Sequence, residues 1–208
     1  MIPSTRRALG ALCAAGVLGI SALVVLPVAA AQASLISFAK CDNSALTHPF
    51  APWADFGSYK LVPGGDFEGA LSGWSLQGDA QPVGGGEPFG ATGSVGSYSL
   101  SLSGGAVATS PPTCVNAAYP TLRFFARTDT PGSTVAVSAL YSTLLGPVTI
   151  PVGVVALSGD WQPTLPMTTL SAIPAALNGG AANIALRFTA LTGTSQIDDV
   201  FVDPMRNG

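Results

Sequence analysis

The chain of 208 residues has little of what most hydrolases use for chemistry. Its only histidine is His48, and it contains neither a Gly-x-Ser-x-Gly turn nor a His-Glu-x-x-His pair. A serine or cysteine hydrolase needs a base beside its nucleophile, and zinc peptidases take two histidines from the second motif. The sequence therefore argues against both classes. The enzyme hypothesis that survives is a glycosidase, which needs only two carboxylates.

Charged residues are scarce as well, because Asp, Glu, Lys and Arg together make up 9% of the chain. Two of the eight cations, Arg6 and Arg7, lie near the N-terminus. Residues 34–208 thus hold six cations and eleven anions, with a formal charge of −5. A nucleic acid partner is not expected, since a phosphate footprint needs clustered cations.

The first 33 residues have the pattern of an export signal. Two arginines precede an uncharged run, residues 8–31, which ends in Ala31-Gln32-Ala33. A positive start, an apolar stretch and an Ala-x-Ala site define a cleaved signal peptide. We predict residues 1–33 as a signal peptide and a secreted or cell-surface protein that begins near Ser34. The apolar run is also long enough to span a bilayer, so an uncleaved membrane anchor is the alternative.

Cysteine is rare, and two of the three cysteines remain after export. Cys13 lies in the signal, which leaves Cys41 and Cys114 in a chain bound for an oxidising compartment. Cysteines of exported proteins usually pair. We predict a disulfide between these two residues, which tethers residues 34–58 to the rest of the chain. Two unpaired thiols are the alternative, and metal binding is disfavoured because no further Cys completes a tetrahedral set.

Helical patterns are largely missing from residues 34–208, and short alternating segments take their place. Gly, Ser, Thr, Val and Pro are abundant, which suits strands joined by turns. Apolar residues at every second position mark a strand with one buried face. This pattern predicts nine strands, at residues 59–62, 73–76, 97–102, 121–127, 134–141, 148–155, 161–165, 183–189 and 196–202. We therefore predict an all-β fold, a two-sheet antiparallel β-sandwich of the jelly-roll kind.

Three segments depart from this pattern. Residues 34–58 carry aromatics and prolines without periodicity, and we expect an N-terminal extended arm that packs across the domain. Residues 78–97 hold three consecutive glycines and two prolines, which predicts a loop. Residues 168–177 suit at most a helical turn or two, because Pro174 limits a helix there.

Two short motifs stand near the ends of the predicted domain, residues 59–208. The first is Gly65-Asp66-Phe67-Glu68 followed by Gly73-Trp74, and the second runs through residues 197–202 with Asp198 and Asp199. This pairing resembles the galactose-binding-like jelly rolls, which include carbohydrate-binding modules of bacterial glycosidases. The resemblance implies that the first and last strands lie close together. Residues 111–114 and 120–127 also resemble segments of secreted actinobacterial proteins.

Many modules of this kind hold a structural calcium ion where the two motifs meet. The resemblance implies Asp66 and Glu68, with Asp198 and Asp199, as candidate ligands. Carboxylate oxygens are the hard ligands that Ca²⁺ requires, and a cation offsets the repulsion between them. The alternative is that the two later aspartates cap turns or accept backbone hydrogen bonds, with Glu68 in solvent.

A binding face for sugars needs aromatic rings and planar polar groups. Alternation places Arg123, Phe125 and Arg127 opposite the apolar side of one strand, and Arg187 opposite that of another. We predict these four as ligand-binding residues on one shallow sheet face. A solvated outer face is the alternative. Trp161 is expected in the core.

The sequence favours a secreted, non-catalytic binding module for carbohydrate or a cell-surface glycan. An envelope or matrix protein with a structural or adhesive role is the alternative, because low charge and high apolar content indicate a surface that associates with itself or a partner. A glycoside hydrolase built on the aspartates and the glutamate of the two motifs is the remote alternative.

Export gives the first testable prediction. When the full chain is expressed in an exporting host, the product in the medium or envelope should begin near Ser34 and should contain no free thiol. Intact-mass spectrometry with and without a reductant checks both points. Recovery of the uncut chain from the membrane fraction would support the anchor instead.

Overall fold

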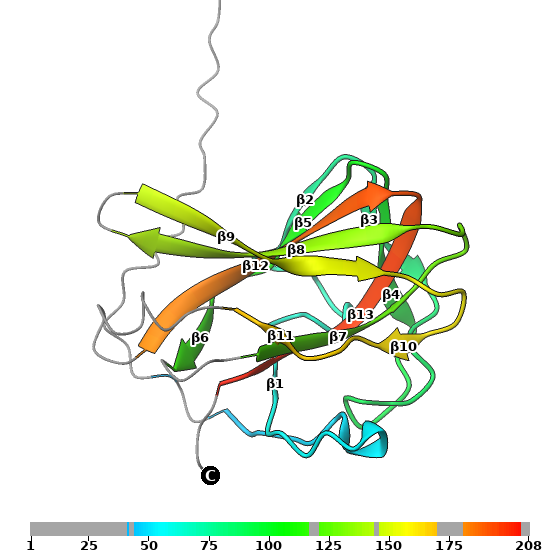
Figure 1. The fold of residues 1–208 in the computed structure, drawn as a ribbon. Helices are drawn as coiled ribbons and strands as arrows, with labels where there is room; N and C mark the ends of the chain where they lie inside the picture. The colour runs from blue at the N-terminus through cyan, green and yellow to red at the C-terminus, as the bar shows by residue number, and fades with distance from the viewer. Residues whose placement is uncertain (1–40, 42–43, 117–120, 144–145, 170–180, 205–208) are drawn as a thin grey trace, which may run out of the picture. The chain divides into compact units, whose positions relative to one another are not determined.

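The fold is a β-sandwich (Figure 1). The computed structural model describes residues 41, 44–116, 121–143, 146–169 and 181–204, all of which belong to one compact unit, Ala33–Gly208. The predicted all-β, two-sheet antiparallel sandwich is confirmed. The predicted signal peptide lies outside the described residues. Within the described ranges, no helix has the length and apolar character needed to cross a membrane.

Two antiparallel sheets make up the sandwich. Sheet I has seven strands in the order β10-β7-β13-β4-β3, with β1 beside β13 and β11 beside β7. Sheet II has six strands in the order β2-β5-β12-β8-β9, with β6 beside β12. The strands of sheet I are β1 (Lys60–Leu61), β3 (Ala80–Gly84), β4 (Tyr98–Ser103), β7 (Thr121–Arg127), β10 (Gln162–Pro163), β11 (Met167–Thr168) and β13 (Thr194–Asp203). Those of sheet II are β2 (Ser75–Gln77), β5 (Val107–Thr109), β6 (Thr113–Asn116), β8 (Thr134–Thr143), β9 (Gly146–Ala156) and β12 (Ala181–Thr192).

Each of the nine predicted segments contains a strand, and four further strands escaped the sequence pattern. Strand β3 lies inside the predicted loop, so that prediction is wrong for residues 80–84. A proline and a terminal glycine hide this strand, and both are tolerated because β3 is at the edge of sheet I. Strands β5, β6 and β11 are too short to show alternation. Of the predicted helical turn, residues 168–169 are described and Thr168 ends β11, while residues 170–177 lie outside the described part.

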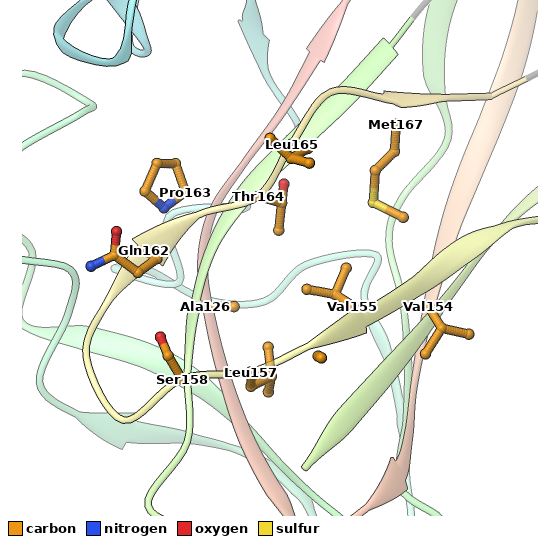
Figure 2. Close-up of a pocket in the computed structure, with 11 residues that line it drawn as sticks. Ala126, Val154, Val155, Leu157, Ser158, Gln162, Pro163, Thr164, Leu165 and Met167 are labelled. Carbon is orange, nitrogen blue, oxygen red and sulfur yellow. The ribbon is translucent and has the colours of Figure 1, made fainter. Parts of the chain in front are cut away.

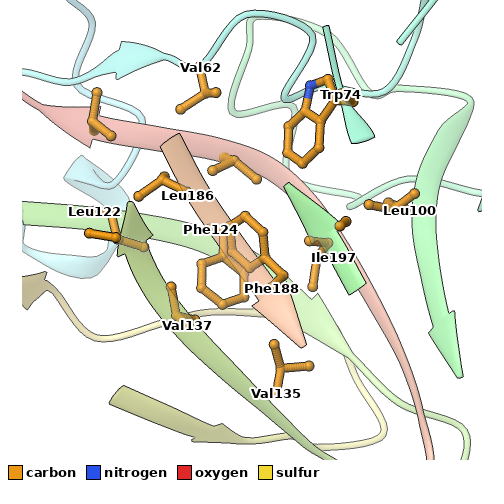
Figure 3. Close-up of a cluster of buried hydrophobic side chains, with 14 of the residues drawn as sticks. Val62, Trp74, Leu100, Leu122, Phe124, Val135, Val137, Leu186, Phe188 and Ile197 are labelled. Atoms are coloured by element: carbon orange, nitrogen blue, oxygen red, sulfur yellow. The ribbon is translucent and has the colours of Figure 1, made fainter. Parts of the chain in front are cut away.

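The main core fills the space between the sheets (Figure 3). At its centre Phe124 of sheet I meets Phe188 of sheet II edge to face, with 5.2 Å between the ring centroids. The predicted inward side of β7, formed by Leu122, Phe124 and Ala126, is buried there. Burying one large apolar side chain contributes about 1.5–3 kcal/mol. This core is what the period-two pattern of the sequence encodes.

The first and last strands meet, as the resemblance implied. Lys60 of β1 pairs with Val202 of β13. The Val62 N–H donates to the Val200 carbonyl at 2.9 Å, and the Val200 N–H donates to the Gly65 carbonyl at 3.0 Å. A Cβ at Gly65 would lie 3.0 Å from the Val200 oxygen, so a larger residue there would push the two strands apart by a few tenths of an ångström. The two motifs therefore close the sandwich by backbone hydrogen bonds.

The N-terminal arm covers the outer face of sheet I, where Figure 1 shows it running on the side away from sheet II. It contains one 3-10 turn, η1 (Ala51–Trp53), and the predicted disulfide joins Cys41 to Cys114 of β6. Phe50 is fully buried and stacks on Phe125 with 5.4 Å between ring centroids. A second hydrophobic cluster thus forms outside the sandwich, from Phe50, Tyr59, Phe125 and Phe201.

A buried cation fastens the arm to the sheet. Arg123 is 4% exposed, and its guanidinium carbon lies 4.1 Å from the centroid of the Phe50 ring. Its Nε donates to the Thr164 carbonyl at 2.7 Å, and its Nη1 donates to Oδ2 of Asp55 at 2.6 Å. Burial alone raises the pKa of Asp55, but hydrogen bonds from Tyr59, Gly57 and Arg123 outweigh it and lower the pKa. Asp55 is therefore held as the anion that the arginine needs.

Breaking this ion pair should loosen the arm. We expect Arg123→Met to lower the free energy of unfolding by about 3 kcal/mol, because removal of one partner leaves the other charge partly buried and unpaired. Urea denaturation of the exported, disulfide-intact protein checks this. The control is Arg127→Met, whose exposed pair with Asp129 should contribute less than about 1 kcal/mol. Equal losses in the two variants would contradict the assignment of Arg123 as the fastening group.

Candidate functional site

The four predicted ligand-binding residues do not share one face. Arg123 and Phe125 point to the outer face of sheet I, as alternation predicted, but both are buried. Arg187 is on β12 of sheet II, between Thr109 of β5 and Ser138 of β8. Arg127, at the end of β7, is the member of the set that reaches a surface pocket.

The predicted open face on β7 is covered for a physical reason. Phe50 of the arm stacks on Phe125, and the aromatic ring of Trp53 lies 5.5 Å from the same ring. Arg123 is desolvated, and its donors go to Asp55 and a backbone carbonyl. Alternation in a single strand cannot reveal this cover, because the covering residues lie far away in the sequence.

A shallow pocket of about 450 Å³ lies beside Arg127, at one edge of sheet I. Two aromatic rings, a guanidinium and a side-chain amide reach it. The loop after β3 contributes one wall, the end of β7 the floor, and the turn between β9 and β10 the other wall. We call it the edge pocket, and its lining residues are Pro88, Phe89, Arg127, Gly159, Asp160, Trp161 and Gln162.

Trp161 owes its position to the register of β10. Gln162 pairs with Ala126 of β7, so one step further along the same register places Trp161 opposite Arg127. The turn before it is anchored, because the Thr128 N–H donates to the Ser158 carbonyl at 2.8 Å. The Trp161 ring is partly exposed and packs against the second hydrophobic cluster. The expectation that it lies in the core is therefore met on one side of the ring only.

The Phe89 ring packs against Trp53 of the arm. Its ring lies edge to face on Trp53 at 4.9 Å and tilted on Phe125 at 5.6 Å, yet 47% of the residue is exposed. The Phe89 N–H donates to the Glu87 carboxylate, and so does that of Ala91 at 2.7 Å. The loop therefore presents a rigid, half-exposed ring to the pocket.

The edge pocket has the chemistry of a site for polar, ring-shaped ligands. Aromatic rings offer apolar faces to the C–H side of a sugar, while Arg127 and Gln162 offer donors and an acceptor for hydroxyl groups. Arg127 also pairs with Asp129, which partly neutralises its charge. Such a surface favours an uncharged ligand.

A second cluster of polar residues lies beneath the Phe89 loop. Strand β13 changes register between Asp198 and Phe201, and Asp199 at this bulge has a φ of 47°. Bulges re-aim side chains, and aspartate tolerates the left-handed region. Glu87 joins these two aspartates, and all three residues are buried with exposures of 1–3%. With Asp66 and Glu68, which affect their titration, they form what we call the carboxylate cluster.

Backbone N–H groups donate hydrogen bonds to the carboxylate oxygens of Asp198 and Glu68. Oδ2 of Asp198 accepts from the Glu87 N–H at 2.8 Å, and Oδ1 accepts from the Asp199 N–H at 2.8 Å. Oε1 of Glu68 accepts from the N–H groups of Ser97 and Tyr98, each at 2.7 Å. The cluster thus holds both ends of the loop that carries Phe89.

Burial raises the pKa of two carboxyl groups in the cluster. Desolvation is the largest cause that raises the pKa of Asp198, to about 7, and the charges of Glu87 and Glu68 raise it further against two backbone hydrogen bonds. Desolvation also raises the pKa of Asp199, with help from the Asp198 charge and a side-chain hydrogen bond to Glu87. A shared proton offsets part of the repulsion that would otherwise require a cation.

The structure brings Asp66, Glu68, Asp198 and Asp199 into one region but does not arrange them as a metal site. Among the described residues, no group of three or more His, Cys, Asp or Glu side chains is placed to hold a metal ion. Oxygens of Asp198 and Glu68 accept backbone hydrogen bonds instead, which is the alternative considered for Asp198, and Asp199 shares a side-chain hydrogen bond with Glu87. Calcium binding there stays a prediction, and no part of the proposed function depends on it.

Sequence reasoning missed Phe89, Trp161 and Glu87 as site residues. Trp161 follows Gly159-Asp160, a turn signal that places it at a strand end, where one ring face is commonly exposed. Phe89 and Glu87 lie in a stretch rich in glycine and proline. No periodic signal singles them out, because their positions depend on contacts with Trp53 and Asp198 from distant parts of the chain.

Comparison with known proteins finds similar solved structures, whereas no family model and no curated protein matches the chain. The CBM22-1 xylan-binding domain of a Paenibacillus barcinonensis protein has a TM-score of 0.49 and 11% identity, over 73% of this chain and 97% of that one. The CBM6 of a Zobellia galactanivorans laminarinase has a TM-score of 0.47 and 8% identity, over 70% of this chain and 98% of that one.

A third similar structure holds the CBM22-1 and GH10 modules of a Clostridium thermocellum endo-1,4-beta-D-xylanase with xylohexaose. Its TM-score is 0.48 and its identity 18%, over 69% of this chain and 28% of that one, so the matched part is about a quarter of the larger protein. Each of these three matched structures is a carbohydrate-binding module or contains one. At these scores the likeness assigns neither a ligand nor a site to this chain.

Stability should fall as pH rises through neutrality. The folded pKa of Asp198 lies above the usual value near 4, so the folded state binds more protons and loses stability as pH rises from about 4 through about 7. We expect at least about 1 kcal/mol less stability at pH 8 than at pH 5, the equivalent of one pKa unit. Asp198→Asn should flatten this dependence. Urea denaturation across this pH range measures it.

The same variants and conditions also test calcium binding. If Ca²⁺ binds the ionised cluster, millimolar CaCl₂ at pH 8 should raise the melting temperature with concentration, and EDTA should reverse the rise. That result would confirm the calcium prediction. A flat pH profile without calcium would contradict the assignment of protons to the cluster.

Proposed function

We propose that this chain is an exported, non-catalytic protein that binds carbohydrate or a cell-surface glycan at the edge pocket. The observation that carries the proposal is the grouping of Phe89, Trp161, Arg127 and Gln162 around one shallow concave surface. Two rings provide stacking faces, and the guanidinium and amide provide directional hydrogen bonds. Open, aromatic-lined surfaces of this kind suit a sugar chain that extends past the protein.

The preformed state of the pocket supports this proposal. Phe89 rests on two other rings, and Trp161 is held by strand pairing and by the second hydrophobic cluster. Rigid side chains lose little conformational entropy when a ligand binds, so more of the contact energy remains as affinity. The arm and the carboxylate cluster thus serve binding by holding the rings still.

A non-catalytic role fits the distribution of acidic groups. Of the described residues that line the edge pocket, only Asp160 carries a carboxylate, whereas glycoside hydrolysis uses a pair. Asp198, Asp199 and Glu87 lie within hydrogen-bonding or electrostatic range of one another, but they are buried and out of reach of a sugar. Nδ1 of His48 is hydrogen-bonded to the Gly57 carbonyl oxygen, with 3.0 Å between the two atoms.

A structural or adhesive role in the cell envelope is the second candidate. Val154 and Leu165 are 60% and 81% exposed, and both line a cleft at the open side of the sandwich. Exposed apolar side chains of this size favour association when they cluster. Self-association without glycan binding would favour this role.

Replacement of either pocket aromatic should weaken glycan binding without unfolding the protein. The exported protein is screened on a glycan array, and the affinity for the best ligand is measured by calorimetry. We expect Trp161→Ala and Phe89→Ala each to weaken binding about tenfold or more, the equivalent of about 1.4 kcal/mol for one lost ring contact. Arg127→Ala should weaken it as well.

Phe56→Ala is the matched control, because this aromatic residue is 75% exposed and lies outside the edge pocket. Its affinity should equal that of the wild type. Circular dichroism of each variant shows that the sandwich is intact. Wild-type binding by Trp161→Ala and Phe89→Ala would reject the edge pocket, and the absence of any glycan ligand would reject the proposed function.

A further inference from the structure

An apolar cleft lies next to the edge pocket, at the open side of the sandwich where β9 and the segment after β10 diverge (Figure 2). It has a volume of about 350 Å³. Figure 2 shows Val155 and Leu157 on one wall facing Thr164 and Leu165 on the other, with Met167 at one end and Gln162 at the opposite end. Ala126 of β7 forms the floor.

The walls of this cleft are fixed by contacts on both sheets. Leu157 N–H donates to the Ser133 carbonyl at 3.1 Å, and Thr164 N–H donates to the Phe124 carbonyl at 2.8 Å. At the far end, a Cβ on Gly153 would lie 2.9 Å from the Met167 methyl, so this glycine gives the methionine side chain its place beside β9. Backbone hydrogen bonds of the fold therefore hold both walls of the cleft in place.

The polar side chains that line the cleft are Ser158, Gln162 and Thr164, and the first and last of these are engaged within the protein. Oγ1 of Thr164 is in contact with the Phe124 N–H at 3.2 Å, and Oγ of Ser158 donates to the Asp160 carbonyl at 2.9 Å. None of the described residues that line it carries a charge. Val154 and Leu165 leave apolar surface exposed at the rim. An occupant that gains from this lining is an uncharged, flexible hydrocarbon.

The cleft and the edge pocket adjoin at one residue, Gln162. Gln162 lines both, and the turn of residues 157–163 separates them. A ligand with its sugar against Trp161 and a chain that passes Gln162 would reach the cleft. We propose that the two sites together bind an amphiphilic glycoconjugate, with the glycan in the edge pocket and an alkyl chain in the cleft. This inference rests on the proposed function and narrows its ligand class.

Strand addition by a second protein chain is disfavoured at this edge. Pro147 and Pro151 interrupt β9, and Pro163 and Pro166 interrupt the opposite wall. Prolines have no N–H to donate, and natural proteins use them to block pairing at exposed sheet edges. The apolar surface of the cleft remains available, and it suits an alkyl chain, which makes no hydrogen bonds.

The test compares three probes on the exported protein by calorimetry, all below micelle-forming concentrations. They are the methyl β-glycosides of glucose, galactose and mannose, the n-octyl β-glycosides of the same sugars, and 1-octanol. The Met167 methyl signal reports on the cleft, and the Trp161 indole N–H signal reports on the edge pocket, both by NMR. One buried methylene strengthens binding about fourfold.

We expect one octyl glycoside to bind at least tenfold more tightly than both its methyl counterpart and octanol, and to shift both signals. Leu165→Asp, which adds a charge at the exposed rim, should remove the gain from the octyl chain and leave the methyl glycoside unaffected. Leu191→Asp is the matched control, because Leu191 is 51% exposed and lies outside the cleft. It should behave as wild type.

Three results would overturn the inference in different ways. Methyl and octyl glycosides of equal affinity that shift only Trp161 would leave the proposed function intact and reject the chain in the cleft. Octanol and octyl glycosides of equal affinity that shift only Met167 would count against the glycan site as well. A dimer seen by light scattering and lost in Leu165→Asp would show that a second copy covers the cleft.

Discussion

The contact of Arg123 with Asp55 and Phe50 is the constraint on which the rest of the outer face depends. A guanidinium that leaves water needs a partner for its charge and acceptors for its donors. The arm supplies the carboxylate and an aromatic face, and the segment after β10 supplies a carbonyl. Because this one cation joins three distant parts of the chain, the outer face of β7 becomes a second core rather than an open surface.

The carboxylate cluster plays a similar part for the loop that follows β3. Asp198 holds the backbone of Glu87, and the side chain of Glu87 holds the backbone of Phe89. The position of an exposed ring is thus set by a buried, partly protonated group at the β13 bulge. Gly86 allows this approach, since a Cβ there would lie 2.9 Å from Oδ2 of Asp198. The bulge in β13 is therefore linked to the edge pocket through hydrogen bonds to the backbone of residues 87 and 89.

The edge pocket and the apolar cleft lie where the sandwich is least regular. Strands β10 and β11 are two residues each, and the turn before β10 lies between the edge pocket and the apolar cleft. A two-sheet sandwich cannot close at its sides, so hydrophobic side chains near an edge stay half-exposed unless something covers them. In this protein the arm covers the outer face of sheet I, and no part of the chain that the structure describes covers the side next to β9.

The sequence by itself determined the two-sheet class, nine of the strands and the disulfide pair, because period-two alternation, turn residues and cysteine pairing are local or compositional signals. The meeting of the first and last strands was implied by the resemblance that the two motifs carry. The sequence also set which side of β7 faces the main core. Only the tertiary structure decided that Phe125 and Arg123 are covered, that Arg187 lies on the other sheet, and that Phe89 and Trp161 face one pocket. These outcomes depend on contacts between residues tens of positions apart, and alternation within one strand carries no information about what packs on its outer face.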